Sequence, residues 1–208
     1  MWDSVVRSFP KWDVYYLCGY ARSLEIHEKS RGFLIDFSFG KERLCYPVME
    51  KDIADSPEFL GLLPANTWFD WETPYGYGGP LATGVLSEPA RRAFLEDLTE
   101  VCKERRVVTQ FLRFHPLLQN QTVLGDVVQY KTIKNTIFMD LSDEGTLFQQ
   151  LYSKNRNMVR KAQKSGVTIF ADRGEHLTDF LDIYHETMDR AHAEPYYYFK
   201  REYYEALR

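Results

Sequence analysis

A long capped helix that runs directly into an apolar strand is the feature that most constrains this fold. The segment SEPARRAFLEDLTEVCKERR begins at Ser87, whose side chain can accept a hydrogen bond from the first turn. Its acids come early and its bases come late, as the helix dipole favours. The segment VVTQFLRF follows at once and has the β-branched and aromatic content of a strand. This pair predicts a fold of the α/β (α+β) class, in which helices cover a sheet.

Further elements are expected before this helix. Residues 32–49 alternate apolar and polar side chains around Gly40, which predicts a hairpin that turns at this glycine. Residues 13–29 predict a helix with Asp13 as its N-cap. Residues 71–84 contain so many glycines and prolines that we expect irregular structure there.

The pattern changes in the last third of the chain. Residues 127–141 predict one or two strands, and from Ser142 the pattern is helical, with a break near Ser153 and a C-terminal glycine at Gly166. A short strand, an amphipathic helix, a loop and the start of another helix are expected at residues 167–172, 176–192, 193–199 and 200–208. Because one strand cannot form a sheet, either this strand joins the first sheet or this part opens a second domain of a longer chain, and we expect the second.

The composition excludes several classes of protein. The chain has 208 residues, 44% of them hydrophobic, and a net charge of -4, which fits a globular domain. Its three cysteines are far apart and form no C-x-x-C, so we expect a reducing compartment and neither a disulfide framework nor a metal site. The N-terminus has no apolar leader and no run could span a membrane, so a cytoplasmic protein without a transmembrane segment is expected.

The segment SKNRNMVRKAQKSGV carries five positive charges and no acid in this acidic chain. Arg156, Arg160 and Lys164 share one helix face, and like charges at this spacing repel each other. Met158 and Val159 are expected on an opposite, buried face. Two interpretations stay open at this point: a solvated face paired with acids elsewhere in the fold, or a surface that binds phosphate, diphosphate or an RNA backbone.

The segment TWFDWETPYGYGGPLATG is a second candidate. Gly78 and Gly79 give a backbone that a ligand can approach closely, and Tyr75 and Tyr77 could stack on a sugar or a base. The two carboxylates of this segment, the candidates for a catalytic base, are Asp70 and Glu72. The alternative is a structural loop that its aromatic residues hold in place.

Other known site patterns are missing from the sequence. There is no G-x-x-x-x-G-K-[ST] and no G-x-G-x-x-G, and no Ser-His-Asp set or H-E-x-x-H can be assigned. His115 is expected to be a hydrogen-bonded structural histidine. The tyrosines of residues 193–208 are expected in core packing, with ligand contact as the alternative.

The segment KNRNMVRKAQKSGVTI resembles the "R-x-x-I-R-K-A-x-K-x-G-V" segment of FemAB-type proteins and their relatives in the GNAT (acyl-CoA N-acyltransferase-like) superfamily. The residues FLDIYHETMDRAHAEPYYYFKREYYEAL resemble the helix, loop and "Y-Y/F-x-x-L" that follow in this family. The segments DVYYLCGYARSLEIH, LCYPVMEKDI and TPYGYGGPL agree more loosely. The resemblance is specific from Asp140 to Leu207.

This resemblance implies a GNAT-like mixed sheet flanked by helices in residues 1–140 and the start of a second GNAT-like domain in residues 141–208. It implies transfer of an aminoacyl or acyl group onto an amine of a cell-wall or surface-polysaccharide precursor. The donor would be aminoacyl-tRNA or acyl-CoA, with no bound cofactor, no DNA and a peripheral place at the inner membrane face. An acetyl-CoA-dependent N-acetyltransferase and a non-catalytic precursor-binding module are the alternatives.

The resemblance also assigns residues. The arginine of "R-x-x-I" falls on Arg156 and the basic pair on Arg160 and Lys161, beside the precursor's diphosphate, and we add Lys154 to this substrate-binding set. Tyr203 falls on a family tyrosine without an assigned role. Two departures concern the first helix, where Tyr20 and Leu24 stand in place of a tryptophan and a lysine of many Fem enzymes. The pyrophosphate loop of acetyl-CoA-binding GNAT proteins is absent from these residues.

Overall fold

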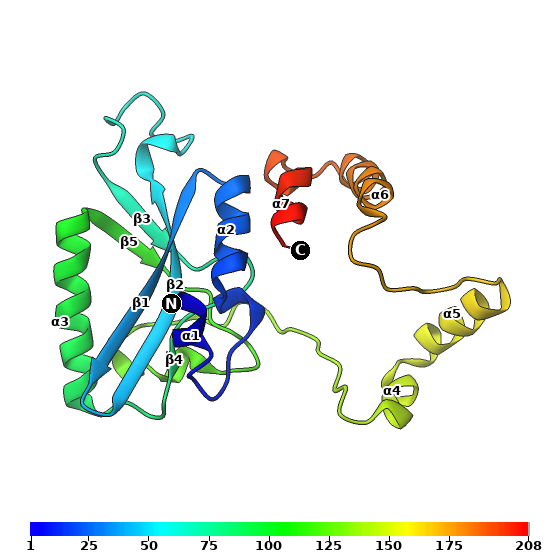
Figure 1. Ribbon diagram of the computed structural model, residues 1–208, viewed down its shortest axis with the longest axis horizontal. Coiled ribbons are helices and arrows are strands. Elements are labelled where there is room, and N and C mark those ends of the chain that lie inside the picture. The colour runs from blue at the N-terminus through cyan, green and yellow to red at the C-terminus, as the bar shows by residue number, and fades with distance from the viewer. Residues whose placement is uncertain (208) are drawn as a thin grey trace. The chain divides into compact units, whose positions relative to one another are not determined.

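A mixed five-stranded sheet forms the centre of the fold (Figure 1). The computed structural model describes residues 1–207, without the side chains of Asp126 and Glu144. Strands β1 (Ser30–Phe39) and β2 (Glu42–Asp52) pair antiparallel, and Gly40 lies in their turn with φ 60°. A left-handed backbone of this kind suits glycine because it has no Cβ. The predicted hairpin is therefore confirmed.

The rest of the sheet is built on β2. Strands β3 (Phe69–Glu72) and β4 (Leu81–Ala82) both pair antiparallel with β2, and β5 (Val107–Phe111) pairs parallel with β3. The strand predicted after the capped helix is confirmed as β5. Residues 71–84 were expected to be irregular throughout, and this is wrong at both ends, because β3 and β4 reach into the segment. Cross-strand pairing with β2 outweighs the local glycine and proline content there.

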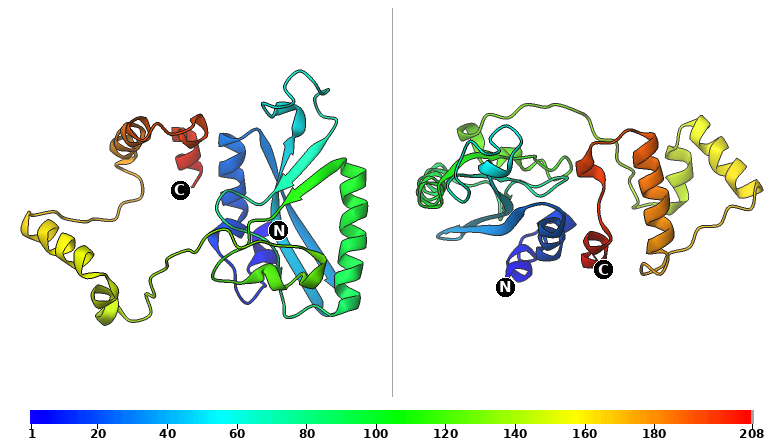
Figure 2. Two further views of the ribbon diagram at one scale, coloured as in Figure 1. Left: turned by 180° about the vertical axis from the view of Figure 1, so that it is seen from behind. Right: turned by 90° about the horizontal axis from the view of Figure 1, so that it is seen from above.

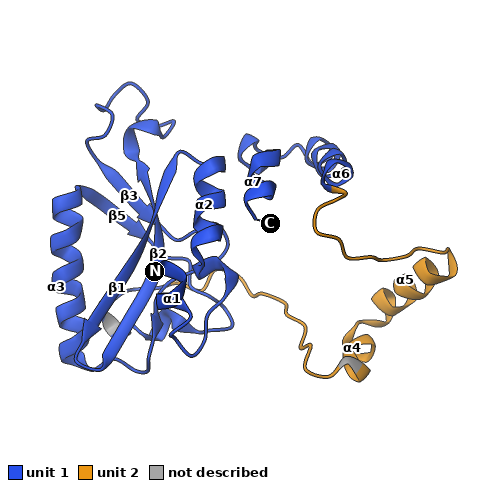
Figure 3. Cartoon of the chain, in the orientation of Figure 1, with its two compact units in different colours: residues 1–130, 177–208 blue, residues 131–176 orange. Residues whose placement is uncertain are grey.

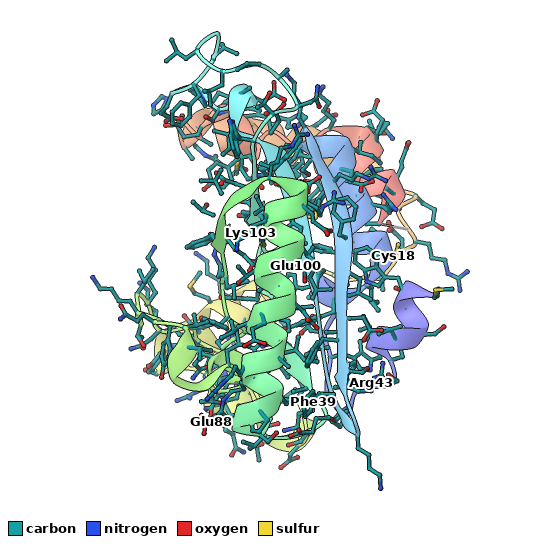
Figure 4. The ribbon with its side chains drawn as sticks, turned by 90° about the vertical axis from the view of Figure 1, so that its left-hand side faces the viewer. Cys18, Phe39, Arg43, Glu88, Glu100 and Lys103 are labelled. Atoms are coloured by element: carbon teal, nitrogen blue, oxygen red, sulfur yellow. The ribbon has the colours of Figure 1, made fainter. Side chains whose placement is uncertain are left out.

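Helix α3 (Glu88–Arg105) covers one face of the sheet, as predicted. Ser87 caps it by accepting a hydrogen bond from the Ala90 N–H at 3.4 Å. Its inner face buries Phe94 in the main core against side chains of β2 and β3, including Tyr46 and Trp71. Figure 4 shows Glu88, together with Glu100 and Lys103, on the outer face of this helix. A mixed sheet flanked by helices is thus confirmed.

Helices α1 (Trp2–Val6) and α2 (Cys18–His27) cover the opposite face of the sheet (Figure 2). The helix expected to have Asp13 as its N-cap has Leu17 there instead, so it begins four residues later than predicted. A 3-10 helix, η1 (Val14–Tyr16), comes first, and Leu17 is extended at φ -81° and ψ 147°. Asp3 then accepts a hydrogen bond from the Cys18 N–H at 2.8 Å, so a residue distant in sequence takes the capping role expected of Asp13.

The contacts divide the chain into two compact units (Figure 3). The first unit combines residues 1–130 with residues 177–208, and the second comprises residues 131–176. In the first unit, the predicted final helices are confirmed as α6 (Leu177–Arg190) and α7 (Arg201–Ala206), with a 3-10 helix, η5 (Pro195–Tyr197), between them. Helix α7 packs on α2. The division into a first GNAT-like domain at residues 1–140 and the start of a second at residues 141–208 stays a prediction.

The second unit contains α4 (Glu144–Gln150) and α5 (Ser153–Lys164), with the predicted break between them. Gly166 has φ 76°, its N–H donates to Gln163 O, and the Val167 N–H donates to Ala162 O. This is the C-terminal glycine motif that the sequence predicts.

Two strand predictions are wrong. Residues 127–141 and 167–172 form no strand in the part of the chain that the structure describes. Most of their apolar side chains are exposed, and Ile137 and Ile169 are 92% and 96% exposed. A strand needs a hydrogen-bonded neighbour, and within residues 1–207 no segment pairs with either of these stretches.

Candidate functional site

A pocket of about 250 Å³ opens in the first unit at the carboxyl ends of β3 and β5. Parallel strands end at the same edge of a sheet, where ligands commonly bind. The Thr73 N–H donates to Phe111 O at 3.0 Å, and the Arg113 N–H then donates to the Thr73 hydroxyl at 3.2 Å. The pocket is lined by Lys51, Glu72, Thr73, Tyr75, Phe111, Arg113, Tyr196 and Tyr197.

A chain of charged groups runs along one side of this pocket. The buried carboxylate of Glu28 accepts a hydrogen bond from the Tyr196 hydroxyl at 2.5 Å and pairs with Lys51 Nζ at 2.9 Å. Lys51 also forms an ion pair with Glu72. Burial lowers the pKa of Lys51, but its bonds to Glu72 and Glu28 outweigh burial and raise this pKa. Lys51 is therefore a cation at neutral pH.

Aromatic side chains build the wall behind the pocket. The Tyr75 ring lies 5.6 Å from that of Tyr196, and the Tyr20 hydroxyl donates to Tyr75 O at 2.7 Å. His27 stacks on Phe199 at 3.9 Å, and its Nε2 lies 2.7 Å from Tyr196 O. Burial raises the pKa of Tyr20 and of Tyr196 above the ordinary phenol value, so both remain neutral donors. This cluster joins α2 and residues 195–203 into one body.

The structure brings only some of the predicted site residues together. Glu72 and Tyr75 line the pocket. Asp70 does not, because its carboxylate accepts hydrogen bonds from the N–H and hydroxyl of Thr109. Tyr203 is buried against Phe199, in the core behind the pocket. Tyr77 lies outside the pocket, with its ring near those of Tyr15 and His115.

The glycine pair has a clear packing role. The Gly78 N–H donates to Arg113 O at 2.8 Å, and a Cβ at Gly78 would lie 2.8 Å from Thr73 Cγ2. Gly79 has φ 81°, and a Cβ there would lie 2.8 Å from Phe114 Cδ1. Both positions therefore need glycine for close packing, while approach of a ligand to this backbone stays a prediction.

His115 is a buried histidine with both ring nitrogens in use. Its Nδ1 accepts hydrogen bonds from the N–H groups of Leu117 and Leu118, each at 3.2 Å. Its Nε2 lies 3.2 Å from Asp13 Oδ2, so the proton belongs on Nε2. With Nδ1 engaged by two backbone donors, the ring has no free lone pair with which to act as a base.

The basic helix α5 lies in the second unit. Arg156 donates to the carbonyl oxygens of Gln149 and Leu151, and Arg160 donates to Asn157 Oδ1 at 3.2 Å. Among the side chains that the structure describes, no acid pairs with a cation of this helix; these cations are Lys154, Arg156, Arg160, Lys161 and Lys164.

The opposite face of α5 is not buried as expected. Met158 is 62% exposed and Val159 is 37% exposed. The expected burial assumed a packing partner for this face, and the described part of the second unit does not provide one.

Sequence reasoning missed most of the pocket. Glu28, Lys51 and Arg113 are ordinary surface residue types with no motif around them. The one available signal for Arg113 is its position just after a predicted strand, where polar side chains often meet at a sheet edge. Nothing in the sequence indicates that Tyr196 reaches Glu28, 168 residues away.

Two absences hold for residues 1–207. In the described part of the chain, no three His, Cys, Asp or Glu side chains are grouped closely enough to hold a metal ion. Within the same residues, the helices are too short or too polar for any of them to cross a membrane.

Comparison with known proteins assigns the last part of the chain. Residues 129–208 match the model of the FemAB family. No curated protein and no solved structure matches the chain. The resemblance to FemAB-type proteins is confirmed over this segment, which includes α5 and the tyrosines on one side of the pocket.

Proposed function

We propose, because residues 129–208 match the model of the FemAB family, that this chain acts in the transfer of an aminoacyl or acyl group. The acceptor is an amine on a cell-wall or surface-polysaccharide precursor, and the GNAT-like character of the fold and a cytoplasmic location belong to the same proposal. The observation that carries it is the basic face of α5, which lies inside the matched segment and has no acidic partner among the described side chains.

The basic face supports binding of a precursor through its diphosphate. Like charges one helix turn apart repel each other by about 0.2–0.5 kcal/mol per pair. An anion that binds between Arg156 and Arg160 turns this repulsion into attraction, and arginine can form two parallel hydrogen bonds to a phosphate. Lys154 and Lys161 add charge to the same helix.

The reaction would form an amide bond. The acceptor amine attacks the carbonyl carbon of an ester in aminoacyl-tRNA or of a thioester in acyl-CoA, and the alcohol or thiol leaves. Backbone N–H groups would stabilise the tetrahedral oxyanion, and a base would accept the proton that the amine loses. Of the two carboxylates considered for this base, Glu72 is favoured, since Asp70 already accepts two hydrogen bonds from Thr109.

The test is a titration of the protein, in the length that its gene encodes, with a nucleotide-linked cell-wall precursor. We expect Arg156→Ala with Arg160→Ala to weaken binding by about tenfold or more. Because Arg156 also bonds to Leu151 O, Lys161→Ala is a second variant that disturbs no bond the structure shows. The matched control is Arg92→Ala with Lys103→Ala on α3. Unchanged affinity in both α5 variants would contradict the proposal.

A turnover assay separates the possible donors. Acetyl-CoA and charged tRNA are each offered with the precursor, and formation of the amide product is measured. Turnover with one donor identifies it. Binding of the precursor without turnover from either donor would instead indicate a non-catalytic binding module.

A further inference from the structure

The pocket at the ends of β3 and β5 contains two groups of opposite charge, Glu72 and Arg113, that keep capacity for a ligand. Lys51 Nζ lies 2.9 Å from Glu28 Oε2 and also pairs with Glu72, and the Tyr196 hydroxyl satisfies the second oxygen of Glu28. One cation thus serves two carboxylates, and the guanidinium of Arg113 is the other cation in the lining.

Glu72 offers a free position for a cation. Its Oε1 pairs with Lys51, and its side chain is 37% exposed. Lys51 is shared with Glu28, so its single charge is divided between two carboxylates. Glu72 can therefore accept a further ammonium group through Oε2 with a net gain of charge pairing.

Arg113 offers the complementary position. Within the described residues, its guanidinium makes one hydrogen bond, a long one of 3.4 Å to Gly76 O, and no ion pair with an acid. The group lies 5.9 Å from the Phe111 ring. Its other N–H groups remain available for a carboxylate, which arginine can bind with two hydrogen bonds.

The register of the strands brings both charges to the same opening, at the edge where β3 and β5 end. Glu72 pairs with Phe111, the last residue of β5, and Arg113 lies two residues further along the chain, so all three residues reach the lining. The half-exposed rings of Tyr75 and Tyr197 complete the lining. The volume of about 250 Å³ is below that of a typical drug-sized site and suits one or two amino-acid residues.

We infer that this pocket binds a free amino acid or a very short peptide, with its ammonium group at Glu72 and its carboxylate at Arg113. The inference names a site in the first unit, apart from α5. It shares Glu72 with the proposed function, where this carboxylate is the candidate base, but binding of the ligand requires no transfer reaction. A ligand with only one of these charges satisfies one side of the pocket and leaves the other unpaired.

The first test changes the ligand and leaves the protein intact. The dipeptide alanyl-alanine is titrated into the isotope-labelled full chain, and chemical shifts are followed by nuclear magnetic resonance. We expect saturable shifts at Tyr75 and Tyr197. The N-acetylated dipeptide, which lacks the ammonium, and the amidated dipeptide, which lacks the carboxylate, are each expected to bind about tenfold more weakly. No saturable binding of the free dipeptide, or equal affinity for the capped forms, would overturn the inference.

The second test changes the protein. Glu72→Gln keeps the shape of the side chain, and Arg113→Gln removes the cation, and each is expected to weaken dipeptide binding by about tenfold. Asp70→Asn is the matched control on the same strand and is expected to leave affinity unchanged. A thermal melt of each variant confirms folding. Equal affinity in all of them would refute the assignment of residues.

Failure of this inference and failure of the proposed function can be distinguished. The variant Arg156→Ala with Arg160→Ala is expected to bind the dipeptide as the unchanged protein does. A variant that loses precursor binding but keeps dipeptide binding reports on α5 alone. A variant that loses dipeptide binding but keeps precursor binding reports on the pocket alone.

Discussion

The Tyr16 hydroxyl donates a hydrogen bond to the Gly78 carbonyl oxygen at 2.9 Å, although 62 residues separate the two in sequence. Asn120 Nδ2 donates to both oxygens, at 2.9 Å and 2.8 Å. These three buried groups satisfy one another, so the cost of burying each of them is offset. The network fixes the glycine loop beside the pocket to the segments before α2 and after β5.

Replacing Tyr16→Phe removes the hydroxyl from this network. We expect the free energy of unfolding to fall by about 1–3 kcal/mol, because Asn120 loses an acceptor in a buried site. Chemical denaturation measures this change. Tyr130→Phe, at an exposed tyrosine, is the control and should change stability by less than about 0.5 kcal/mol. Equal stability of the two variants would show that the network contributes nothing measurable.

Gly79→Ala and Gly61→Ala form a matched pair. Both glycines have a positive φ, 81° and 77°, so both alanines meet backbone strain of about 1–3 kcal/mol. Only at Gly79 does the new Cβ also meet a buried ring, Phe114 at 2.8 Å, while nothing lies within 4 Å at Gly61. We therefore expect Gly79→Ala to be the more destabilising change in urea denaturation. The reverse order would contradict the close packing of this loop.

Lys51→Met tests the ion network of the pocket. The change leaves the buried carboxylate of Glu28 without its cation, and we expect a loss of about 1–3 kcal/mol in the free energy of unfolding. Lys29→Met removes an exposed ion pair with Asp55 instead, and exposed pairs contribute at most about 1 kcal/mol. The two variants carry the same chemical change, so the difference between their free energies of unfolding measures the effect of burial.

The buried phenols predict the behaviour at alkaline pH. Burial raises the pKa of Tyr16, Tyr20 and Tyr196 in the folded protein, whereas the unfolded chain ionises near 10.0. Above pH 10.0 the unfolded state therefore loses protons first, and stability is full below this pH and falls as pH rises beyond it. Absorbance of the tyrosinate ion should show a fraction of the tyrosines that ionises only on unfolding. A single transition at the ordinary value would contradict this.

The hydrogen bonds of Glu42 are expected to make the stability of the folded protein depend on pH in the acid range. Its carboxylate accepts hydrogen bonds from the Ser87 hydroxyl and N–H, each at 2.7 Å, and these bonds lower the pKa of Glu42 below 4.5. The stabilisation is present above this ordinary value and is lost as pH falls through the lower, folded value. We expect Glu42→Gln to reduce the acid dependence of thermal unfolding, relative to Glu96→Gln on the outer face of α3.

Local chemistry made much of this fold predictable. Ser87, Gly40 and Gly166 each determine the conformation of their neighbours, so the capped helix, the hairpin and the end of α5 were found from sequence. The same reasoning failed for Ile137 and Ile169, because an apolar alternation specifies a strand only where a partner strand exists. It also failed at Asp13, because Asp3 instead accepts the hydrogen bond from the first N–H of α2.

The candidate site was less predictable for the same reason. Glu72 and Tyr75 stood out by type and proximity in one segment. The pocket residues around Glu72 come from β2, from a position two residues after β5 and from a turn more than a hundred residues later, and no local rule links them. Charge alone identified α5, since a run of cations without acids is visible in sequence, although the exposure of Met158 is not.

The first unit is assembled from two stretches of chain, residues 1–130 and 177–208, which meet where α7 packs on α2. The core residues Ala21, Leu24 and Met49 are covered by Phe199 and Tyr203 from the second stretch. Cleavage anywhere between residues 131 and 176 would therefore leave two polypeptides held together without a covalent link. The two stretches of the first unit could therefore be produced as separate polypeptides, and their reassociation could be measured.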